Sequence, residues 1–255
     1  MKSPRCRAKS CEYARPISPL KISCLCDVLP QRIYVRQGNS PLWCSILKLL
    51  VVSGFFGCGK TTFIINAAKR LVGEYGLKVA IIVNDVGEIG IDDKIINSYG
   101  LKVKELFGGC VCCQLGEDMI KTLRLVDRRI RPDLTVLEPS GAADPSQILS
   151  VVSLAKNFEL EMLPLIILVD ATQLMLLLSE MPLTIRKVAF GEIVLINKVD
   201  AVSPEELSEV KKEVEKINRS AAIRPISARR EEDIKSIIEM LKIKDGRPQT
   251  KIRKK

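Results

Sequence analysis

The sequence of 255 residues contains no histidine and few aromatic side chains. Without histidine the chain has neither an imidazole general base nor an imidazole metal ligand, so a bound transition metal must rely on thiolates and carboxylates. Aromatic residues make up 4% of the chain, whereas hydrophobic residues make up 47%. Aliphatic side chains must therefore build the core, as they do in buried parallel sheets.

The sequence also lacks the long apolar runs of membrane proteins. It has no run of about eighteen uncharged apolar residues, and its basic start, residues 1–10, is not followed by the apolar stretch of a secretory signal. These absences predict a soluble cytoplasmic protein without a membrane partner. Nine cysteines in that compartment favour thiols used for metal or redox chemistry over a disulfide framework.

The net charge of +10 is concentrated at the two ends of the chain. Residues 1–50 hold nine basic and two acidic residues, a net +7, and residues 242–255 hold seven basic residues and one acidic residue, a net +6. The middle of the chain is left with a net charge of −3. Because nucleic-acid binding needs a basic surface on the folded domain, we expect no nucleic-acid partner for the core.

Composition divides the chain into three predicted segments. Residues 1–46 form a basic leader that contains five prolines and five cysteines without sustained apolar periodicity. We interpret it as irregular or disordered, or as the result of a start site assigned too far upstream; a zinc knuckle is the alternative. The four cysteines of that alternative are Cys6, Cys11, Cys24 and Cys26. Residues 47–242 form the folded domain, and residues 243–255 form a basic disordered tail.

From residue 47 onward, short apolar segments alternate with amphipathic ones. The predicted strands are 47–52, 78–83, 134–137, 164–169, 192–196 and 222–226, and the predicted helices include 60–73, 115–130, 204–217 and 231–242. This alternation is typical of a doubly wound α/β fold with a mostly parallel sheet and helices on both faces. Such sheets bind ligands at the carboxyl ends of their strands, so we expect the site residues in the loops that follow them.

A complete phosphate-binding loop, G-F-F-G-C-G-K-T-T, follows the first predicted strand. Its glycines let backbone N–H groups surround phosphate, while Lys60 is expected to reach the β- and γ-phosphates and the Thr61 hydroxyl to bind Mg²⁺. The predicted nucleotide-binding residues of this loop are Gly54, Gly57, Cys58, Gly59, Lys60, Thr61 and Thr62. The position between a strand and a helix is the context that this motif requires.

A second motif, N-K-V-D at residues 197–200, follows the fifth predicted strand. The carboxylate of Asp200 can accept two hydrogen bonds from guanine that adenine does not offer, so the motif predicts GTP as the nucleotide. Asn197 is expected to hold the loop and contact the base, and the Lys198 stem to cover its face. Ser227 and Ala228, after the next strand, would supply a further backbone contact.

Three thiols lie within four residues at Cys110, Cys112 and Cys113, directly after two glycines. Thiolates are soft ligands for one metal ion, and because they must lose their protons on binding, the affinity should rise with pH. The alternative interpretation is a set of small buried core residues.

Taken together and in order, these motifs resemble the CobW family of metallochaperone GTPases, with UreG and HypB as more distant relatives. The similarity spans residues 47–242 and also includes N-D-V-G-E-I-G-I-D at 84–92 and E-P-S-G at 138–141. It implies a SIMIBI-like P-loop NTPase fold and GTP hydrolysis coupled to delivery of a divalent metal to a client protein. Zinc is the metal most often carried by this family, with cobalt or nickel as alternatives, and a homodimer is implied by the class.

The resemblance assigns roles to further residues. Glu138 would organise Mg²⁺, and Gly141 would sense the γ-phosphate through its N–H; both join Lys60 and Thr61 as predicted catalytic residues. Glu88 is the carboxylate expected beside the metal thiols, while Asp85 stands where the family usually has Glu.

Two departures leave other functions open. First, many family members carry a second C-terminal domain and a His-rich segment, so client docking or metal storage is expected to be missing here or supplied by another protein. Second, the Cys-bearing leader of residues 1–46 is foreign to the family pattern. The rival interpretations are a regulatory GTP-binding switch with structural cysteines, an iron–sulfur scaffold ATPase, and a nickel or cobalt insertion GTPase.

Overall fold

The computed structural model describes residues 34–37, 40–43, 46–83, 102–105, 114–153 and 159–243. The chain divides into a first unit that ends at Cys44 and a second unit that begins at Ser45. In the first unit, β1 (Tyr34–Gln37) and β2 (Ser40–Trp43) pair as an antiparallel hairpin. This hairpin lies in the leader, where the sequence pattern predicted no regular element.

The second unit is built on an eight-stranded sheet. Its strands are β3 (Leu47–Gly54), β4 (Val79–Val83), β5 (Lys102–Glu105), β6 (Leu134–Glu138), β7 (Leu160–Met162), β8 (Ile166–Asp170), β9 (Ile193–Asn197) and β10 (Ala222–Pro225). The order across the sheet is β10-β9-β8-β3-β6-β4-β5, with β7 paired to β3, and these pairings are parallel. The predicted doubly wound, parallel α/β fold is confirmed.

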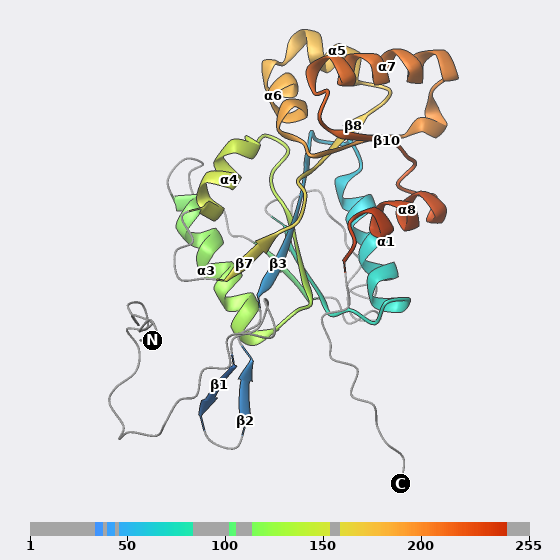
Figure 1. The fold of residues 1–255 in the computed structure, drawn as a ribbon. Coiled ribbons are helices and arrows are strands. Elements are labelled where there is room, and N and C mark those ends of the chain that lie inside the picture. The colour runs from blue at the N-terminus through green and yellow to red at the C-terminus, as the bar shows by residue number, and fades with distance from the viewer. Residues whose placement is uncertain are drawn as a thin grey trace, which may run out of the picture. The chain divides into compact units, whose positions relative to one another are not determined.

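Helices cover both faces of this sheet (Figure 1). They are α1 (Lys60–Gly73), α3 (Gln114–Arg129), α4 (Pro145–Ser153), α5 (Leu174–Glu180), α6 (Pro182–Phe190), the 3-10 turn η1 (Val199–Ala201), α7 (Pro204–Ile217) and α8 (Glu231–Met240). Helices α1 and α8 pack with one apolar cluster, and α3, α4, α5, α6 and α7 with the other.

Alternating side chains of the central strand supply both clusters. Leu50 and Val52 of β3 belong to the cluster of α1 and α8, whereas Leu49 and Val51 belong to the opposite one. Both sets are buried, because successive side chains of a strand point to opposite faces of the sheet and both faces are covered. The near-continuous apolar run of β3 is the sequence consequence of this double burial.

Several elements were absent from the sequence prediction because their local signals are weak. Strand β5 alternates lysine with other residues in K-V-K-E, and β7 has only three residues. Helices α5 and α6 meet at Met181, with Pro182 in the first turn of α6, so that two short helices occupy one apolar stretch. Segment β5 becomes a strand because it pairs with β4, and β7 because it pairs with β3. These contacts between distant parts of the chain outweigh the weak local propensity.

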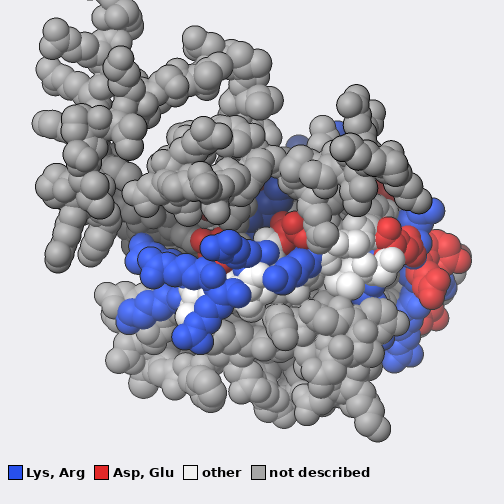
Figure 2. Space-filling model, turned by 90° about the horizontal axis from the view of Figure 1, so that it is seen from below, with Lys and Arg blue, Asp and Glu red and all other residues white. Residues whose placement is uncertain are grey.

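The carboxyl ends of the strands and their starting ends form two different surfaces. Figure 2 looks at the starting ends, where the described surface carries a band of Lys and Arg side chains. The last turn of α3 brings Arg128 and Arg129 to this end, because β6 begins shortly afterwards. The phosphate loop follows the carboxyl end of β3 and therefore lies at the other end of the sheet. In the part of the chain that the structure describes, no helix is both long and apolar enough to span a bilayer.

Candidate nucleotide-binding site

The phosphate loop joins the carboxyl end of β3 to the first turn of α1. Gly59 precedes the helix with a φ of 95°, in the left-handed region. A Cβ atom at Gly59 would lie only 2.2 Å from Nδ2 of Asn197. Both the backbone conformation and the close approach of Asn197 therefore require glycine at this position.

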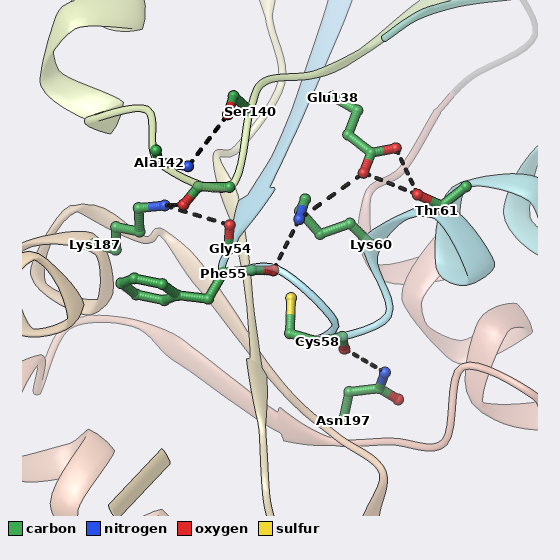
Figure 3. Close-up of polar contacts among 11 residues, drawn as sticks. Gly54, Phe55, Cys58, Lys60, Thr61, Glu138, Ser140, Ala142, Lys187 and Asn197 are labelled. Atoms are coloured by element: carbon green, nitrogen blue, oxygen red, sulfur yellow. Dashed lines mark hydrogen bonds and ion pairs between the residues drawn. The ribbon is translucent and has the colours of Figure 1, made fainter. Parts of the chain in front are cut away.

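The cation and the two oxygen-bearing side chains of the phosphate site converge at the start of α1 (Figure 3). Lys60, 7% exposed, donates a 2.8 Å hydrogen bond to the carbonyl of Phe55, and its Nζ lies 3.9 Å from Oε1 of Glu138. The Thr61 hydroxyl lies 3.0 and 3.1 Å from the two carboxylate oxygens of Glu138. The structure thus brings three of the four predicted catalytic residues together: Lys60 and Thr61 from the first turn of α1, which follows β3, and Glu138 from the end of the adjacent strand β6.

The pair of Thr61 and Glu138 fits a magnesium ion. A hydroxyl and a carboxylate are hard oxygen ligands, which Mg²⁺ prefers together with water and substrate phosphates. Glu138 is 7% exposed and ends β6, so its backbone is anchored by the sheet. When bound at these two side chains, Mg²⁺ would neutralise charge on nucleotide phosphates.

Asn197 connects the phosphate loop with the predicted base-binding loop. Its Nδ2 donates to the carbonyl of Cys58 at 2.8 Å, and its Oδ1 accepts from the N–H of Ala228 at 2.8 Å. The side chain is 3% exposed, so neither bond is shared with bulk water. Asn66 of α1 adds a bond from its Nδ2 to the carbonyl of Ala228 at 2.8 Å. The sequence motif predicted Asn197 as the holder of the loop, and the contacts show which groups it holds.

Lys198 leaves the end of β9 in a left-handed conformation, with a φ of 64°. Its Nζ lies 2.6 Å from Oδ2 of Asp170, a buried residue at the carboxyl end of the neighbouring strand β8. The other oxygen of Asp170 accepts from the N–H and the hydroxyl of Thr172, at 2.9 and 2.7 Å. Asp170 was not predicted as a site residue, although its position as a polar residue ending an apolar strand was a usable signal.

Asp200 is exposed in η1 and faces the loop after β10. A hydrogen bond from the Ser227 side chain, helped by a backbone N–H and by the charges of Arg230 and Arg229, lowers the pKa of the Asp200 carboxyl below its ordinary value. It is therefore ionised at neutral pH, which is the form that the predicted pairing with guanine requires. Ser227 itself is buried, and its N–H is held by Asp233 of α8 at 2.8 Å.

The remaining predicted residues of the phosphate loop have different environments. Gly54 ends β3, where a Cβ atom would lie 2.4 Å from the carbonyl oxygen of Leu168. Cys58 is buried, and burial raises the pKa of its thiol. Gly57 and Thr62 are exposed. Cys58 thus contributes its backbone carbonyl to the Asn197 bond, while its thiol belongs to the core.

Gly141 lies in the loop after β6, in contact with the phosphate loop. A Cβ atom at Gly141 would lie 2.8–2.9 Å from three ring carbons of Phe56. Phe56 belongs to the phosphate loop, and its ring centroid lies 5.8 Å from Nζ of Lys60. The Phe56 ring therefore lies between Gly141, the fourth predicted catalytic residue, and Lys60.

Lys187 of α6 is a residue of this site that the motifs did not reveal. It is completely buried and donates hydrogen bonds to the carbonyl oxygens of Gly54 and Gly141 (Figure 3). Lysine in a helix is normally assigned to the solvent face. The available signal was its spacing, because Thr184, Lys187 and Val188 share one helical face and are all buried.

Comparison with known proteins identifies the class of this site. Residues 48–225, more than half of the chain, match the family described as CobW/HypB/UreG, nucleotide-binding domain. The chain belongs to the CobW/HypB/UreG family. The resemblance carried by the sequence motifs is therefore confirmed.

Within this family, similar proteins include the zinc chaperone YeiR of Escherichia coli, 32% identical over 158 residues, which cover 61% of this chain and 47% of YeiR. Zinc-regulated GTPase metalloprotein activator 1 of Dictyostelium discoideum is 26% identical over 219 residues, which cover 69% of this chain and 45% of that protein. The chain thus spans about half the length of these relatives. The Zn(II)-bound YjiA GTPase from E. coli shares the fold, with a TM-score of 0.54 and 21% identity over 70% of this chain and 57% of that one.

The predicted metal ligands Cys110, Cys112, Cys113 and Glu88 lie outside the described residues, as does the 84–92 motif. Among the residues that the structure does describe, no group of three or more Cys, Asp or Glu side chains is arranged to hold a metal ion. The thiol site therefore stays a prediction from sequence.

Proposed function

We propose that this chain is a cytoplasmic GTP-hydrolysing metallochaperone that holds a divalent metal ion, zinc in the first place, and delivers it to a client metalloprotein. The observation that carries the nucleotide part is the convergence of Lys60, Thr61 and Glu138 at the start of α1. Asn197 joins this phosphate site to the loop that would bind guanine. One continuous site can thereby bind both ends of GTP.

Catalysis would depend on positioning and charge. Lys60 is expected to contact the β- and γ-phosphates, Thr61 and Glu138 to hold Mg²⁺, and the Gly141 N–H to contact the γ-phosphate. The sequence shows no obvious residue to orient the attacking water, so intrinsic turnover should be slow. Asp200, held ionised beside Ser227, would select guanine over adenine.

The cargo part of the proposal rests on sequence and family. Cys110, Cys112 and Cys113 offer thiolates, which suit Zn²⁺, and the chain has no histidine to favour other ligand sets. The relatives named above are a zinc chaperone and a zinc-regulated GTPase metalloprotein activator. Binding and loss of the γ-phosphate would order and release the 84–92 segment and the thiol loop, so that metal affinity follows the nucleotide state.

The nucleotide part is tested by phosphate release from GTP with Mg²⁺. Lys60→Ala should lower the turnover at least about 100-fold, because it removes the cation aimed at the transferring phosphate. Lys211→Ala removes a half-exposed lysine of α7 and is the matched control, with turnover unchanged. Hydrolysis by Lys60→Ala at the parent rate would exclude this mechanism.

The cargo part is tested by Zn²⁺ affinity, measured by competition with a chelating dye in the presence of Mg²⁺ and GTPγS, GDP or no nucleotide. A coupled chaperone should show affinities that differ by about 5–150-fold between nucleotide states. Cys112→Ser should abolish the difference, whereas Cys44→Ser, outside both cysteine motifs, should preserve it. Equal affinities in all three states would favour a regulatory GTP-binding switch with structural cysteines, and loss of bound zinc in Cys24→Ser would assign a zinc knuckle to the leader.

A further inference from the structure

Lys187 is buried on the core-facing side of α6, with 0% of its surface exposed. An ammonium group loses its hydration in such a place, and this loss is costly unless other polar groups replace the water. The replacing groups come from the phosphate loop and from the loop after β6. The energetic cost of burying Lys187, together with partners in the nucleotide site, suggests that the side chain serves that site.

The ammonium of Lys187 bridges the ends of two neighbouring strands. Its Nζ lies 3.3 Å from the carbonyl oxygen of Gly54, at the end of β3, and 2.5 Å from that of Gly141, after the end of β6. It also lies 4.3 Å from the centroid of the Phe55 ring, within the range of a cation–π interaction. One cation therefore links the start of the phosphate loop to the loop of Gly141.

Gly141 is held from a second direction by Phe56. The ring of Phe56 occupies the space that a side chain at position 141 would need. Lys187 donates to the carbonyl of Gly141, and the ring of Phe56 packs against the Cα of Gly141. The first contact links Gly141 to Gly54 through the Lys187 ammonium, and the second links it directly to the phosphate loop. The backbone of Gly141 therefore has a defined position relative to Gly54.

The surroundings of Lys187 bring its pKa closer to neutral pH but leave the side chain mostly protonated at pH 7. Burial, followed by repulsion from Lys60, lowers the pKa of Lys187 to about 8 from 10.5, while Cys58 and Asp144 act in the opposite direction. Asp144 also forms a 2.8 Å ion pair with Arg186, next to Lys187 on α6. At pH 7 the ammonium form predominates and donates to both carbonyls.

We propose that Lys187 is a positioning residue of the nucleotide site, which fixes the backbone of Gly141 against the phosphate loop so that Gly141 can contact the γ-phosphate. The inference rests on the proposed function, in which Gly141 recognises GTP and not GDP. Lys187 itself touches neither the phosphate nor the metal in this role; it acts through the backbone that it holds. Its contribution should therefore appear in the preference for GTP over GDP.

The test compares the Kd of GTPγS with the Kd of GDP, both with Mg²⁺, for the parent chain, Lys187→Met and Lys211→Met. Methionine keeps the length of the side chain and removes its donors. Lys187→Met should weaken GTPγS binding at least about tenfold, since a charged hydrogen bond is lost, and change GDP binding by less than about threefold. Lys211→Met makes the same chemical change at an exposed site and should leave both constants unchanged.

A purely structural role predicts a different result. If Lys187 only supported the core, Lys187→Met would lower the melting temperature while the ratio of the two constants stayed at the parent value, and the proposal would be wrong. If the variant does not fold, the pH dependence of the parent chain decides. Deprotonation of Lys187 should lower the preference for GTPγS between pH 7 and pH 9.5, and a flat ratio would overturn the proposal.

Failure of the proposed function would look different from failure of this inference. A parent chain that binds neither GTPγS nor GDP would contradict the proposed function before any variant is made. A parent chain that prefers GTPγS, together with a Lys187→Met variant of equal preference, would contradict only the role of Lys187.

Discussion

On the base side of the phosphate loop the neutral amide of Asn197 bridges Cys58 and Ala228, whereas on the Gly141 side the charged ammonium of Lys187 bridges Gly54 and Gly141. Both side chains are buried, and both bridge two backbone groups that come from different parts of the chain. They differ in what burial costs. An amide with its hydrogen bonds satisfied loses little, whereas an ammonium loses a large hydration energy that two carbonyls only partly replace.

The two bridges therefore differ in their response to pH. The Asn197 bridge does not titrate between pH 5 and 10, so the distance between the phosphate loop and the base loop is insensitive to pH. The Lys187 bridge has a pKa of about 8 and loses its charge under mildly alkaline conditions. The side of the site that we propose to distinguish GTP from GDP is thus held by the interaction that pH alters more easily.

Of the substitutions that test these two bridges, Asn197→Ala is expected to have the largest effect on stability and nucleotide binding. The substitution leaves the carbonyl of Cys58 and the N–H of Ala228 without their buried partner, so the free energy of unfolding should fall by about 3 kcal/mol. Urea unfolding would measure the loss. GTPγS and GDP should be weakened together, because the base and phosphate loops no longer hold one spacing.

Asn218→Ala is the matched control for Asn197→Ala. Asn218 is buried as well, and its Nδ2 donates to the carbonyls of Val188 and Gly191 at 2.9 and 2.8 Å, neither of which belongs to the phosphate loop. Its loss should destabilise the fold to a similar degree and leave the nucleotide affinity of the folded protein unchanged. Equal nucleotide defects in both variants would show that stability, and not loop spacing, governs binding.

The second effect is the pH dependence of stability that Lys187 introduces. Its pKa is about 8 in the native protein and 10.5 in the unfolded chain, so between these values the unfolded chain binds more protons and the free energy of unfolding rises with pH. Relative to Lys187→Met, the parent chain should gain about 2 kcal/mol between pH 7 and pH 9.5. Urea unfolding of both chains across this range measures the difference, and parallel profiles would contradict a depressed pKa.

The smallest effect is expected from Arg186→Gln. Arg186 forms a 2.8 Å ion pair with Asp144, but its side chain is 61% exposed and the pair is screened by solvent. The free energy of unfolding should change by less than about 1 kcal/mol, and the preference for GTPγS over GDP should stay at the parent value. A loss of preference as large as that of Lys187→Met would transfer the role from the buried ammonium to the surface ion pair of the same helix.

Local sequence patterns predicted the elements that the nucleotide site is built on. The predicted helices 60–73 and 204–217 coincide with α1 and α7, and the apolar strands preceding Lys60, Asn197 and Ser227 are present with ends shifted by one or two residues. These elements could be predicted from sequence because each has a strong apolar periodicity or a motif with a fixed backbone conformation. Helix α6 was not, because its nine residues begin with proline and carry both Arg186 and Lys187.

The sequence by itself predicted the class of the site: a phosphate loop at residues 54–62, a carboxylate at 200 for guanine and a thiol cluster for metal, of which the last two stay predictions. Those properties are local, because a loop conformation or a ligand set depends on residues that are neighbours in the chain. Only the tertiary structure decided that Lys187 is buried under the phosphate loop, 133 residues from Gly54 in sequence. Its partners are backbone carbonyls, which every residue carries. The spacing along α6 could therefore indicate that Lys187 is buried, but not which groups it contacts once the sheet brings β3, β6 and α6 together.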